Sequence, residues 1–434
     1  MAERETHVVV IGGGLAGLAA AAYLARGGRD VVLVEKAAAV GGRARTQSDD
    51  GFELNLGAHA LYRRGAGAAV LQELGVSVAG GRPTGEGGYA MHGGAMHTLP
   101  VGFVSLLTTG LLRPGEKIEA GRLFAGLRHV DGERIQDLPL SSWLARIHSP
   151  VVRQLLEATA RVATYTNDPE HMSAGAALDQ MQRALASGVL YLHHGWQTLV
   201  DGLRRVAEDA GVLILERHPA VAIERGPDVR GVRLDDGRTL ACGAVIVAGG
   251  PDTVAMLAGA PDRSSVVSEW AARARPVRAA SLDVALRVLP RPHATFALGI
   301  DEPLYASVHS AVARLGPEGG AVVHVMRYGG LAGDPAAAVE RQLARFLDAL
   351  QPGWRDHVVR QRFLPDLVVA HALPEAALGG TRGRPGPEVP DVPGLYVAGD
   401  WVGPEGLLAD ASLASARAAA FAILARETRV TSAA

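Results

Sequence analysis

The sequence is poor in cysteine, lysine and aromatic residues. Cys242 is the only cysteine among 434 residues, which excludes an intramolecular disulfide framework and favours a reducing compartment. Lys36 and Lys117 are the only lysines, so arginine supplies nearly all of the positive charge. The formal net charge of −2 leaves no overall field that would attract nucleic acid, and no nucleic-acid partner is expected.

Long apolar runs are also missing. No uninterrupted run reaches the ~18 residues that a membrane-spanning helix needs. The closest is Leu99 to Leu112, LPVGFVSLLTTGLL, which we expect to be a buried or lid segment, with peripheral membrane contact as the alternative. The opening MAERETHVVV lacks the regions of a signal peptide, so we expect a cytoplasmic protein. With 48% hydrophobic residues, the chain can form two substantial domains.

A dinucleotide-binding pattern is present near the start of the chain. His7 to Ile11 is a short β-branched run, and the GGGLAG that follows fits G-x-G-x-x-G and opens an alanine-rich helix. In such a turn the first glycine allows a tight bend, the second allows a pyrophosphate to approach, and the third allows helix and strand to pack. The free N–H groups of the helix then face the phosphates. The residues expected there are Gly12, Gly14, Leu15, Ala16 and Gly17.

An acidic residue and a second glycine pair complete this pattern. Val31 to Val34 predicts a second strand, and Glu35 at its end lies 18 residues after Gly17. A carboxylate there accepts hydrogen bonds from both ribose hydroxyls and disfavours a 2′-phosphate. Lys36 belongs to the same predicted site. Gly42 and Arg43 add a close backbone approach and a charged partner for the pyrophosphate.

Two segments carry a resemblance to a known family. Gly41 to Thr46, GGRART, resembles the second glycine motif of the FAD-binding amine oxidase, phytoene desaturase and protoporphyrinogen oxidase superfamily, and Gly394 to Asp400, GLYVAGD, resembles its C-terminal motif. The resemblance implies FAD. We expect FAD to be bound without a covalent link, because Cys242 is far in sequence from any stretch assigned to the isoalloxazine. The chain departs from the family at His193 to Trp196, where a Pro-Gly-Gly turn is common.

The resemblance also assigns further residues to the cofactor. Gly57, Ala58 and His59 return the chain towards the flavin, where His59 either packs beside the cofactor or handles a proton. The backbone of Val221 pairs with the adenine. Gly399 allows close approach, and Asp400 accepts from the ribityl chain or holds a phosphate-bound water. The helix that begins near Leu407 and Leu408 points its N-terminus at the flavin, where it stabilises the reduced anion.

The expected architecture is α/β. A doubly wound, Rossmann-like FAD domain comprises residues 1–61, 193–275 and 385–434, and a discontinuous α+β substrate domain comprises residues 62–192 and 276–384. Amphipathic helical patterns at 141–164 and 174–186 are typical of helices that could wall an apolar pocket.

Only one dinucleotide site is predicted. The strand at 244–248 ends in Gly249-Gly250-Pro251-Asp252, which does not repeat the glycine fingerprint. The electrons are therefore expected to come from an organic substrate and to leave to oxygen, a quinone or a protein. His193 and His194 are neighbours on an extended segment and point to opposite faces, so no metal site is predicted.

The function that follows is an FAD-dependent dehydrogenase, desaturase or oxidase that transfers a hydride from an apolar or amphipathic small molecule to flavin N5. His59 and Trp401 are the catalytic candidates. Chemistry on carbon is favoured over amine oxidation, because many amine oxidases of the superfamily hold a lysine through water to N5 and neither lysine here fits. An aromatic content of 5% also weakens an amine cage, although Trp401 could supply one wall.

Two other classes stay open from the sequence. An FAD-dependent isomerase or hydratase would keep the fold and cofactor without net redox chemistry. A prenyl-protein escort would use the fold without flavin, and Glu35, Arg43 and Asp400 would then have no function.

Overall fold

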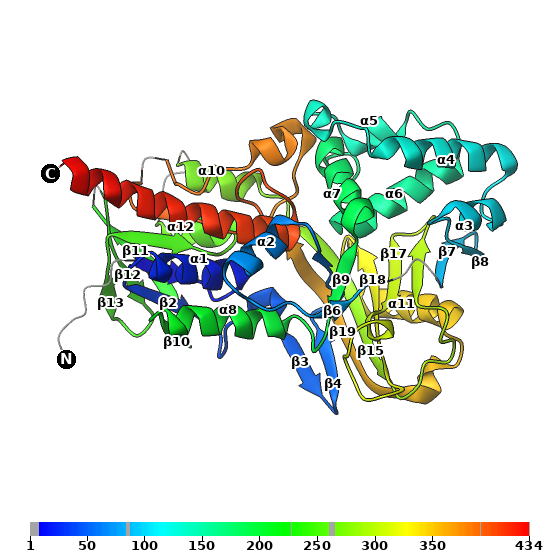
Figure 1. Ribbon diagram of the computed structural model, residues 1–434, viewed down its shortest axis with the longest axis horizontal. Helices are drawn as coiled ribbons and strands as arrows, with labels where there is room; N and C mark the ends of the chain where they lie inside the picture. The colour runs from blue at the N-terminus through cyan, green and yellow to red at the C-terminus, as the bar shows by residue number, and fades with distance from the viewer. Residues whose placement is uncertain (1–7, 84–86, 227, 260–264, 391, 434) are drawn as a thin grey trace.

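Two sheets lie side by side in the molecule, each with helices packed against it (Figure 1). The computed structural model describes residues 8–83, 87–226, 228–259, 265–390 and 392–433. His7, at the start of the first predicted strand, lies outside the described residues. So does Asp391, in the segment 379–393, whose many Gly and Pro residues predict a linker.

The first sheet is parallel and has five strands in the order β10-β2-β1-β14-β20. Its β-branched strands are mostly buried on both faces, as parallel sheets require. These strands are β1 (Val8–Ile11), β2 (Val31–Glu35), β10 (Leu213–Glu216), β14 (Ala244–Val247) and β20 (Leu395–Val397). They come from all three segments of the chain that the sequence assigns to the cofactor domain, and they confirm the predicted α/β class.

Helices cover one face of this parallel sheet, and a small antiparallel sheet covers the other. The helices on the first face are α1 (Leu15–Arg26), α2 (Ala66–Glu73), α8 (Gln197–Asp209) and α12 (Leu408–Ala433). The second face packs against β11 (Ala220–Arg225), β12 (Val229–Leu234), β13 (Thr239–Ala241), α9 (Pro251–Leu257) and α10 (Val266–Arg273). The predicted boundary at residue 62 differs from this packing, because Val70 and Leu71 of α2 lie in the core with α1 and α12.

The second sheet has seven strands in the order β19-β15-β18-β17-β16-β7-β8. They are β7 (Gly88–His92), β8 (Ala95–Thr98), β15 (Val277–Leu286), β16 (Phe296–Gly299), β17 (Leu304–Val308), β18 (Ala321–Tyr328) and β19 (Val358–Ala370). Helix α11 (Ala336–Leu350) packs on one face through Val339, Leu343 and Leu347. Strand β7 pairs in parallel with β16, so the two visits of the chain to this unit form one sheet.

A helical layer stands beside the second sheet and comprises α3 (Phe103–Thr108), α4 (Pro114–Leu127), α5 (Leu140–Leu144), α6 (Pro150–Thr164) and α7 (Ala174–Ser187) (Figure 1). The helical pattern at 141–164 is divided into α5 and α6, a correction to the prediction. The division has a local cause, because Pro150 occupies the first turn of α6 and the Ser149 hydroxyl accepts from the Val152 N–H at 3.4 Å.

Short elements connect these layers. The strands are β3 (Thr46–Asp49), β4 (Phe52–Asn55), β5 (Leu61–Tyr62), β6 (Gly80–Gly81) and β9 (Val189–Leu192). The 3₁₀ helices are η1 (Gly42–Ala44), η2 (Gly132–Ile135), η3 (His309–Ala311), η4 (Trp354–His357), η5 (Ala376–Leu378) and η6 (Gly380–Gly383).

One helix in the described part of the chain is long and apolar enough to cross a membrane by composition. It is the segment Leu408–Arg426 of α12, with a mean hydropathy of 1.4. Half of this segment is buried in the molecule, and α12 packs along α1 and α2, as a core helix does.

Candidate functional site

The first glycine motif forms a tight turn between β1 and α1. Gly12 has a φ of +105°, and a Cβ at Gly17 would lie 1.8 Å from the carbonyl oxygen of Gly12, so both positions exclude larger residues. A Cβ at Gly14 would meet nothing within 4 Å, so open space lies beside the start of α1. The buried Leu15 and Ala16 form the first turn of that helix. This open cradle at a helix N-terminus fits a pyrophosphate.

The second glycine motif packs directly on the first. The N–H of Gly41 donates to the carbonyl of Gly13 at 2.7 Å, and a Cβ at Gly42 would come 3.5 Å from the Cα of Gly14. Gly41 and Gly42 both have positive φ, +119° and +53°. The two motifs therefore form one backbone surface, as a shared cofactor site requires.

Glu35 lies at the end of β2 with 9% of its surface exposed. Its carboxylate accepts from the N–H of Gly13 at 2.7 Å and from the N–H of Ala37 at 2.8 Å. An ionised carboxylate has about four acceptor positions, so capacity for ribose hydroxyls remains. Lys36 is exposed. The contact with Gly13 shows that the predicted ribose ligand also holds the glycine turn.

Arg43 and Asp400 bind each other, a contact that the sequence did not predict. Their side chains form an ion pair at 2.6 Å, and the N–H of His371 donates to the same carboxylate at 3.0 Å. Asp400 is 1% exposed; burial raises its pKa, but the charges of Arg43 and His371 outweigh this and hold the pKa well below its usual range. The ion pair joins the second glycine motif to the C-terminal motif.

The C-terminal motif leads into α12. The Ser415 hydroxyl accepts from the N–H of Gly399 at 2.9 Å, which ties the helix to the strand before it. Leu407 is buried, and Leu408, the first residue of α12, has a φ of +56°, an uncommon conformation for leucine. Such strain concentrates at ligand sites, and the placement of the flavin at this helix N-terminus stays a prediction.

Trp401 lies in the core. It is 2% exposed, its indole N–H donates to the carbonyl of Gly249 at 2.8 Å, and its ring meets Trp270 edge-on at 5.7 Å. This placement favours a packing role over the predicted wall of an amine cage.

His59 is half-buried beside the Gly57–Ala58 turn. Its Nδ1 lies 3.1 Å from the carbonyl oxygen of Gly57, and its ring is 4.9 Å from that of Trp196. Burial lowers the pKa of His59 to about 4, so the imidazole is neutral at neutral pH and can accept a proton only weakly. Trp196 follows the turn that replaces Pro-Gly-Gly, and the side chain of Asn55 fixes that turn by accepting from the Trp196 N–H at 3.0 Å.

Val221 is half-exposed on β11. The pairing of β11 with β12 passes from Ala220 to Ala222, so the register skips Val221. A residue left out of a ladder at a bulge keeps its backbone groups for another partner, as adenine pairing would need.

An aromatic cluster adjoins these residues on the side of the second sheet. The Tyr165 hydroxyl donates to the carbonyl of Ala58 at 3.0 Å, and the Tyr165 ring meets Tyr328 at 6.1 Å. Tyr305 lies between Tyr328 and Phe296, at 6.4 and 5.4 Å. Ala58, Leu407, Tyr305 and Tyr328 share one hydrophobic core. No sequence motif marks this cluster, because its members come from the C-terminal end of α6 and from three strands.

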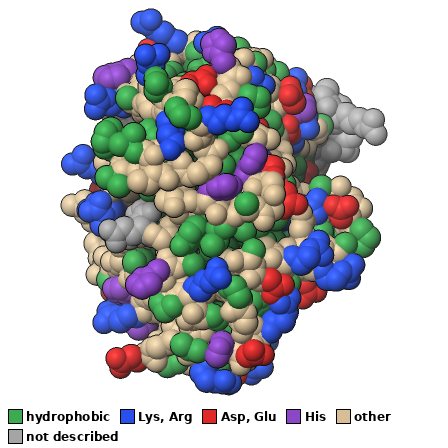
Figure 2. All heavy atoms as spheres, turned by 90° about the vertical axis from the view of Figure 1, so that its right-hand side faces the viewer, with side chains coloured by type: hydrophobic (Ala, Val, Ile, Leu, Met, Phe, Trp, Pro, Cys, Tyr) green, Lys and Arg blue, Asp and Glu red, His purple; other side chains and the backbone are tan. Residues whose placement is uncertain are grey.

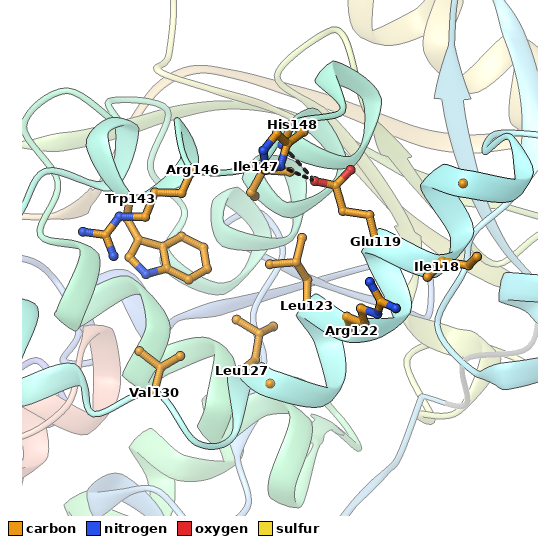
Figure 3. Close-up of a pocket in the computed structure, with 12 residues that line it drawn as sticks. Ile118, Glu119, Arg122, Leu123, Leu127, Val130, Trp143, Arg146, Ile147 and His148 are labelled. Atoms are coloured by element: carbon orange, nitrogen blue, oxygen red, sulfur yellow. Dashed lines mark hydrogen bonds and ion pairs between the residues drawn. The ribbon is translucent and has the colours of Figure 1, made fainter.

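A cavity of about 530 Å³ opens between α4 and residues 143–148 (Figure 3). Its apolar wall is formed by Leu123, Leu127, Val130, Trp143 and Ile147, with Arg122 and Arg146 among the other lining residues. Leu127, Trp143 and Ile147 belong to the same hydrophobic core as Ala58 and Leu407. One apolar core therefore extends from this cavity to the expected flavin end.

Neither lysine lies at that end, because Lys36 is exposed after β2 and Lys117 on α4 donates to the carbonyl of Leu107. Within the described ranges, no group of three or more His, Cys, Asp or Glu side chains is arranged to hold a metal ion. The Cys242 thiol is buried, and burial raises its pKa to about 12, so it offers no thiolate for a covalent flavin link.

A family model described as flavin-containing amine oxidoreductase matches residues 15–424. The chain belongs to this family. The match spans the second glycine motif, the aromatic cluster and the C-terminal motif, and it identifies the cofactor of the site as FAD.

Two curated members of the wider group are similar over part of their length. The chain is 38% identical to a protoporphyrinogen oxidase from Bos taurus over 142 residues, which is 30% of this chain and 29% of the relative. It is 28% identical to a hydroxyneurosporene desaturase from Cereibacter sphaeroides over 301 residues, 58% of this chain and 57% of the relative. The chain thus matches well under two thirds of the length of either.

Solved structures share the fold over nearly the whole chain. An oxidoreductase from Methanosarcina mazei has a TM-score of 0.76 at 21% identity and covers 95% of this chain and 99% of its own. Cyclohexylamine oxidase from Brevibacterium oxydans has a TM-score of 0.74 at 17% identity, with 98% and 100% coverage. At this identity the likeness shows the fold alone.

Proposed function

We propose that the protein is an FAD-dependent oxidoreductase that removes a hydride from an apolar or amphipathic small molecule. The observation that carries this proposal is the convergence of Ala58, Leu407 and the aromatic cluster in one core, next to the paired glycine motifs. When bound, FAD supplies a hydride acceptor at N5. The chain's own residues then bind the carbon skeleton, exclude water and fix its orientation.

The lining of the aromatic cluster supports an uncharged substrate. Tyr305 and Tyr328 are 3% and 2% exposed, and the Tyr328 hydroxyl has no hydrogen-bond partner among the described residues. A buried hydroxyl without a partner is costly, so it can orient a polar group of an otherwise apolar substrate. The desaturase and protoporphyrinogen oxidase relatives favour oxidation of carbon or of a macrocycle over oxidation of a simple amine.

The electron acceptor is proposed to be oxygen, a quinone or a protein. A nicotinamide donor would need its own anchored pyrophosphate. Within the described part of the chain, the other strand–turn–helix of the parallel sheet with a glycine pair leads from β14 to α9, and Pro251 in its first turn lacks an N–H.

An anaerobic screen tests the proposal. Polyenes, porphyrinogens and hydrophobic amines are mixed with the FAD-loaded protein, and the visible flavin absorbance is followed. Bleaching by a polyene or a porphyrinogen is expected, together with an oxidised product. Turnover of a substrate without bleaching and without a change in its oxidation level would instead show an isomerase or hydratase.

We also propose that the α3 end of a cytoplasmic protein docks at a membrane surface. The predicted burial of residues 99–112 is only partly right, because Leu99, Leu111 and Leu112 are buried while Phe103 and Val104 are 76% and 71% exposed. No residue of α3 is buried. Figure 2 views the molecule from this end and shows hydrophobic side chains gathered among Lys and Arg side chains.

Charge supports a bilayer with anionic headgroups as the partner. Glu116 and Glu119 of α4 each have a backbone partner, because their carboxylates accept from the Arg113 N–H at 2.7 Å and the His148 N–H at 2.8 Å. Arg113 and Arg122 are exposed beside them. An apolar helix with cations at its border is typical of interfacial binding.

A further inference from the structure

A row of polar side chains crosses the second sheet on its buried face. Arg362 of β19, Asp283 of β15, His324 of β18 and Ser307 of β17 are register partners across four adjacent strands. The neighbours of Asp283 on the opposite face, Leu282 and Val284, are apolar and belong to the core under α11, as the two-residue period of a strand requires. The row is therefore confined to the face away from α11.

Asp283 is the centre of this row and is fully buried. Its Oδ1 accepts from the Ser281 hydroxyl and from Nδ1 of His324, both at 2.7 Å, and its Oδ2 accepts from Arg362 at 2.7 Å. Burial raises the pKa of Asp283, but His324 and Arg362 outweigh it and hold the pKa below its usual value. A buried ionised carboxylate is expensive, and such pairs are weak contributors to net stability.

The side chains of Arg362 and Asp283 also bind one turn of the predicted FAD domain. Arg362 also donates to the carbonyl of Asn55, and the N–H of Gly57 donates to Oδ2 of Asp283 at 3.4 Å. Gly57 has a φ of +80°, and a Cβ there would come within 3.1 Å of Leu367 on β19, so the turn fits closely against the sheet. In Figure 1, β4, which ends at Asn55, lies beside β15 and β18.

The far side of this turn is fixed as well. The side chain of Asn55 accepts from the N–H of Trp196 at 3.0 Å and from the Thr46 hydroxyl at 2.7 Å. The ring of His59, four residues after Asn55, contacts that of Trp196 in a tilted arrangement. The segment that carries Ala58 and His59 is thus clamped between the polar row and the Trp196 turn.

We propose that Asp283 is a positioning residue that, with Arg362, holds the turn 55–57 so that Ala58 and His59 face the flavin in a fixed arrangement. This inference rests on the proposed function, in which residues 57–59 face the flavin. The polar row joins the second sheet to the predicted FAD domain. Its buried charge orients the turn 55–57.

The test begins with apo-protein. Asp283→Asn keeps the shape of the side chain and removes its charge. We expect amide hydrogen exchange in the peptide covering residues 52–62 to become at least about tenfold faster, while peptides of α11 keep their protection. Asp366→Asn is the matched control, because it breaks the exposed Arg278–Asp366 ion pair between the same two strands and should change neither.

The second readout uses FAD-loaded protein. In Asp283→Asn the visible circular dichroism of the flavin should change, and the limiting rate of anaerobic bleaching by substrate should fall about tenfold or more with a smaller effect on KM. The double variant D283N/R362Q removes both charges and decides the question if the single variant does not accumulate. If hydrogen exchange at 52–62 becomes faster in the variant but the parent protein turns over no substrate, the positioning role is upheld and the proposed function is contradicted.

Unchanged exchange at 52–62 in a folded variant, with unchanged flavin dichroism and bleaching rate, would overturn the inference. Failure of both variants to fold would also overturn it, because the row would then be a folding element.

Discussion

The fold buries the carboxylate of Asp410, which disfavours its ionised form. It lies in the first turn of α12 at 2% exposure, one carboxylate oxygen accepts from the Gly67 N–H at 2.8 Å, and the other has no partner among the described residues. Burial raises the pKa of Asp410 from 3.8 to about 6. Because the folded pKa is raised, the folded state prefers the protonated acid, and the stability this gives below about pH 4 is lost as pH rises through 6.

Asp410→Asn should therefore stabilise the protein near neutral pH. The amide keeps an acceptor for Gly67 and carries no charge, so the gain is at most about 3 kcal/mol, at ~1.36 kcal/mol per pKa unit. Denaturant unfolding at about pH 7.5 should show the gain, and unfolding at about pH 4 should show little of it. Asp209→Asn, an exposed acid on α8 that is not among the charges acting on Asp410, serves as control. An equal gain at both pH values would contradict the assigned pKa.

Glu35→Ala should weaken FAD binding by roughly 1.5 to 3 kcal/mol, the scale of hydrogen bonds to a charged group. The structure adds that the Gly13 N–H also loses its acceptor, so apo-protein should lose some stability. Glu35→Gln should cost less in both respects. Titration of apo-protein with FAD measures the effect, and an unchanged dissociation constant for the Ala variant would remove Glu35 from the site.

The residues of the glycine fingerprint and Glu35 were predictable because their roles follow from short-range spacing. The partners of Asp400 were not, since His371 lies 328 positions after Arg43 and nothing local marks it. Asp283 was missed for the same reason, because its partners lie on neighbouring strands that are distant in the sequence.

At the scale of elements, two glycines of the β1–α1 turn should respond differently to the same change. Gly17→Ala puts a Cβ 1.8 Å from the Gly12 carbonyl oxygen and should unfold or strongly destabilise apo-protein, by several kcal/mol. Gly14→Ala meets open space and should leave apo-protein intact, yet lower FAD affinity by about tenfold or more through lost backbone approach. Thermal unfolding and FAD titration separate the two. Normal FAD binding by Gly14→Ala would mean that the pyrophosphate lies elsewhere.

The exposed helix α3 is expected to contact a membrane surface. Phe103→Glu should reduce binding to vesicles of anionic phospholipid by about tenfold or more, because burying an aromatic side chain in lipid is worth roughly 1.5 to 3 kcal/mol. Phe421→Glu, an exposed aromatic residue on α12, is the matched control and should bind as the parent does. Sedimentation with vesicles measures both. Equal binding of the parent and the Phe103 variant would exclude α3 as the contact.

Elements with a clear period were predicted well, and elements divided by a cap were not. The strand predicted at 31–34 and the helical pattern at 174–186 correspond to Val31–Glu35 and Ala174–Ser187, because strand and helix periodicity act locally. The pattern at 141–164 hides a break at His148-Ser149-Pro150, where a capping serine and a proline start a new helix in the same apolar phase.

For the whole molecule, the fold class and cofactor could be predicted from motifs, but the assembly of the substrate sheet could not. Strands β7 and β16 pair in parallel, although the whole helical layer lies between Gly88 and Phe296 in the sequence. The aromatic cluster and the polar row of Asp283 exist only once these strands are adjacent. The proposed substrate site therefore depends on pairs of strands that are far apart in the sequence.

We propose that an organic substrate, and no nicotinamide, reduces the bound FAD. The experiment is anaerobic stopped-flow mixing of the FAD-loaded protein with a polyene or porphyrinogen panel, and separately with NADH and NADPH. We expect saturable bleaching by a member of the panel and no bleaching by either nucleotide above about one per second, within the usual range of turnover numbers. Saturable bleaching by NADH or NADPH above that rate, with none by the panel, would contradict the account.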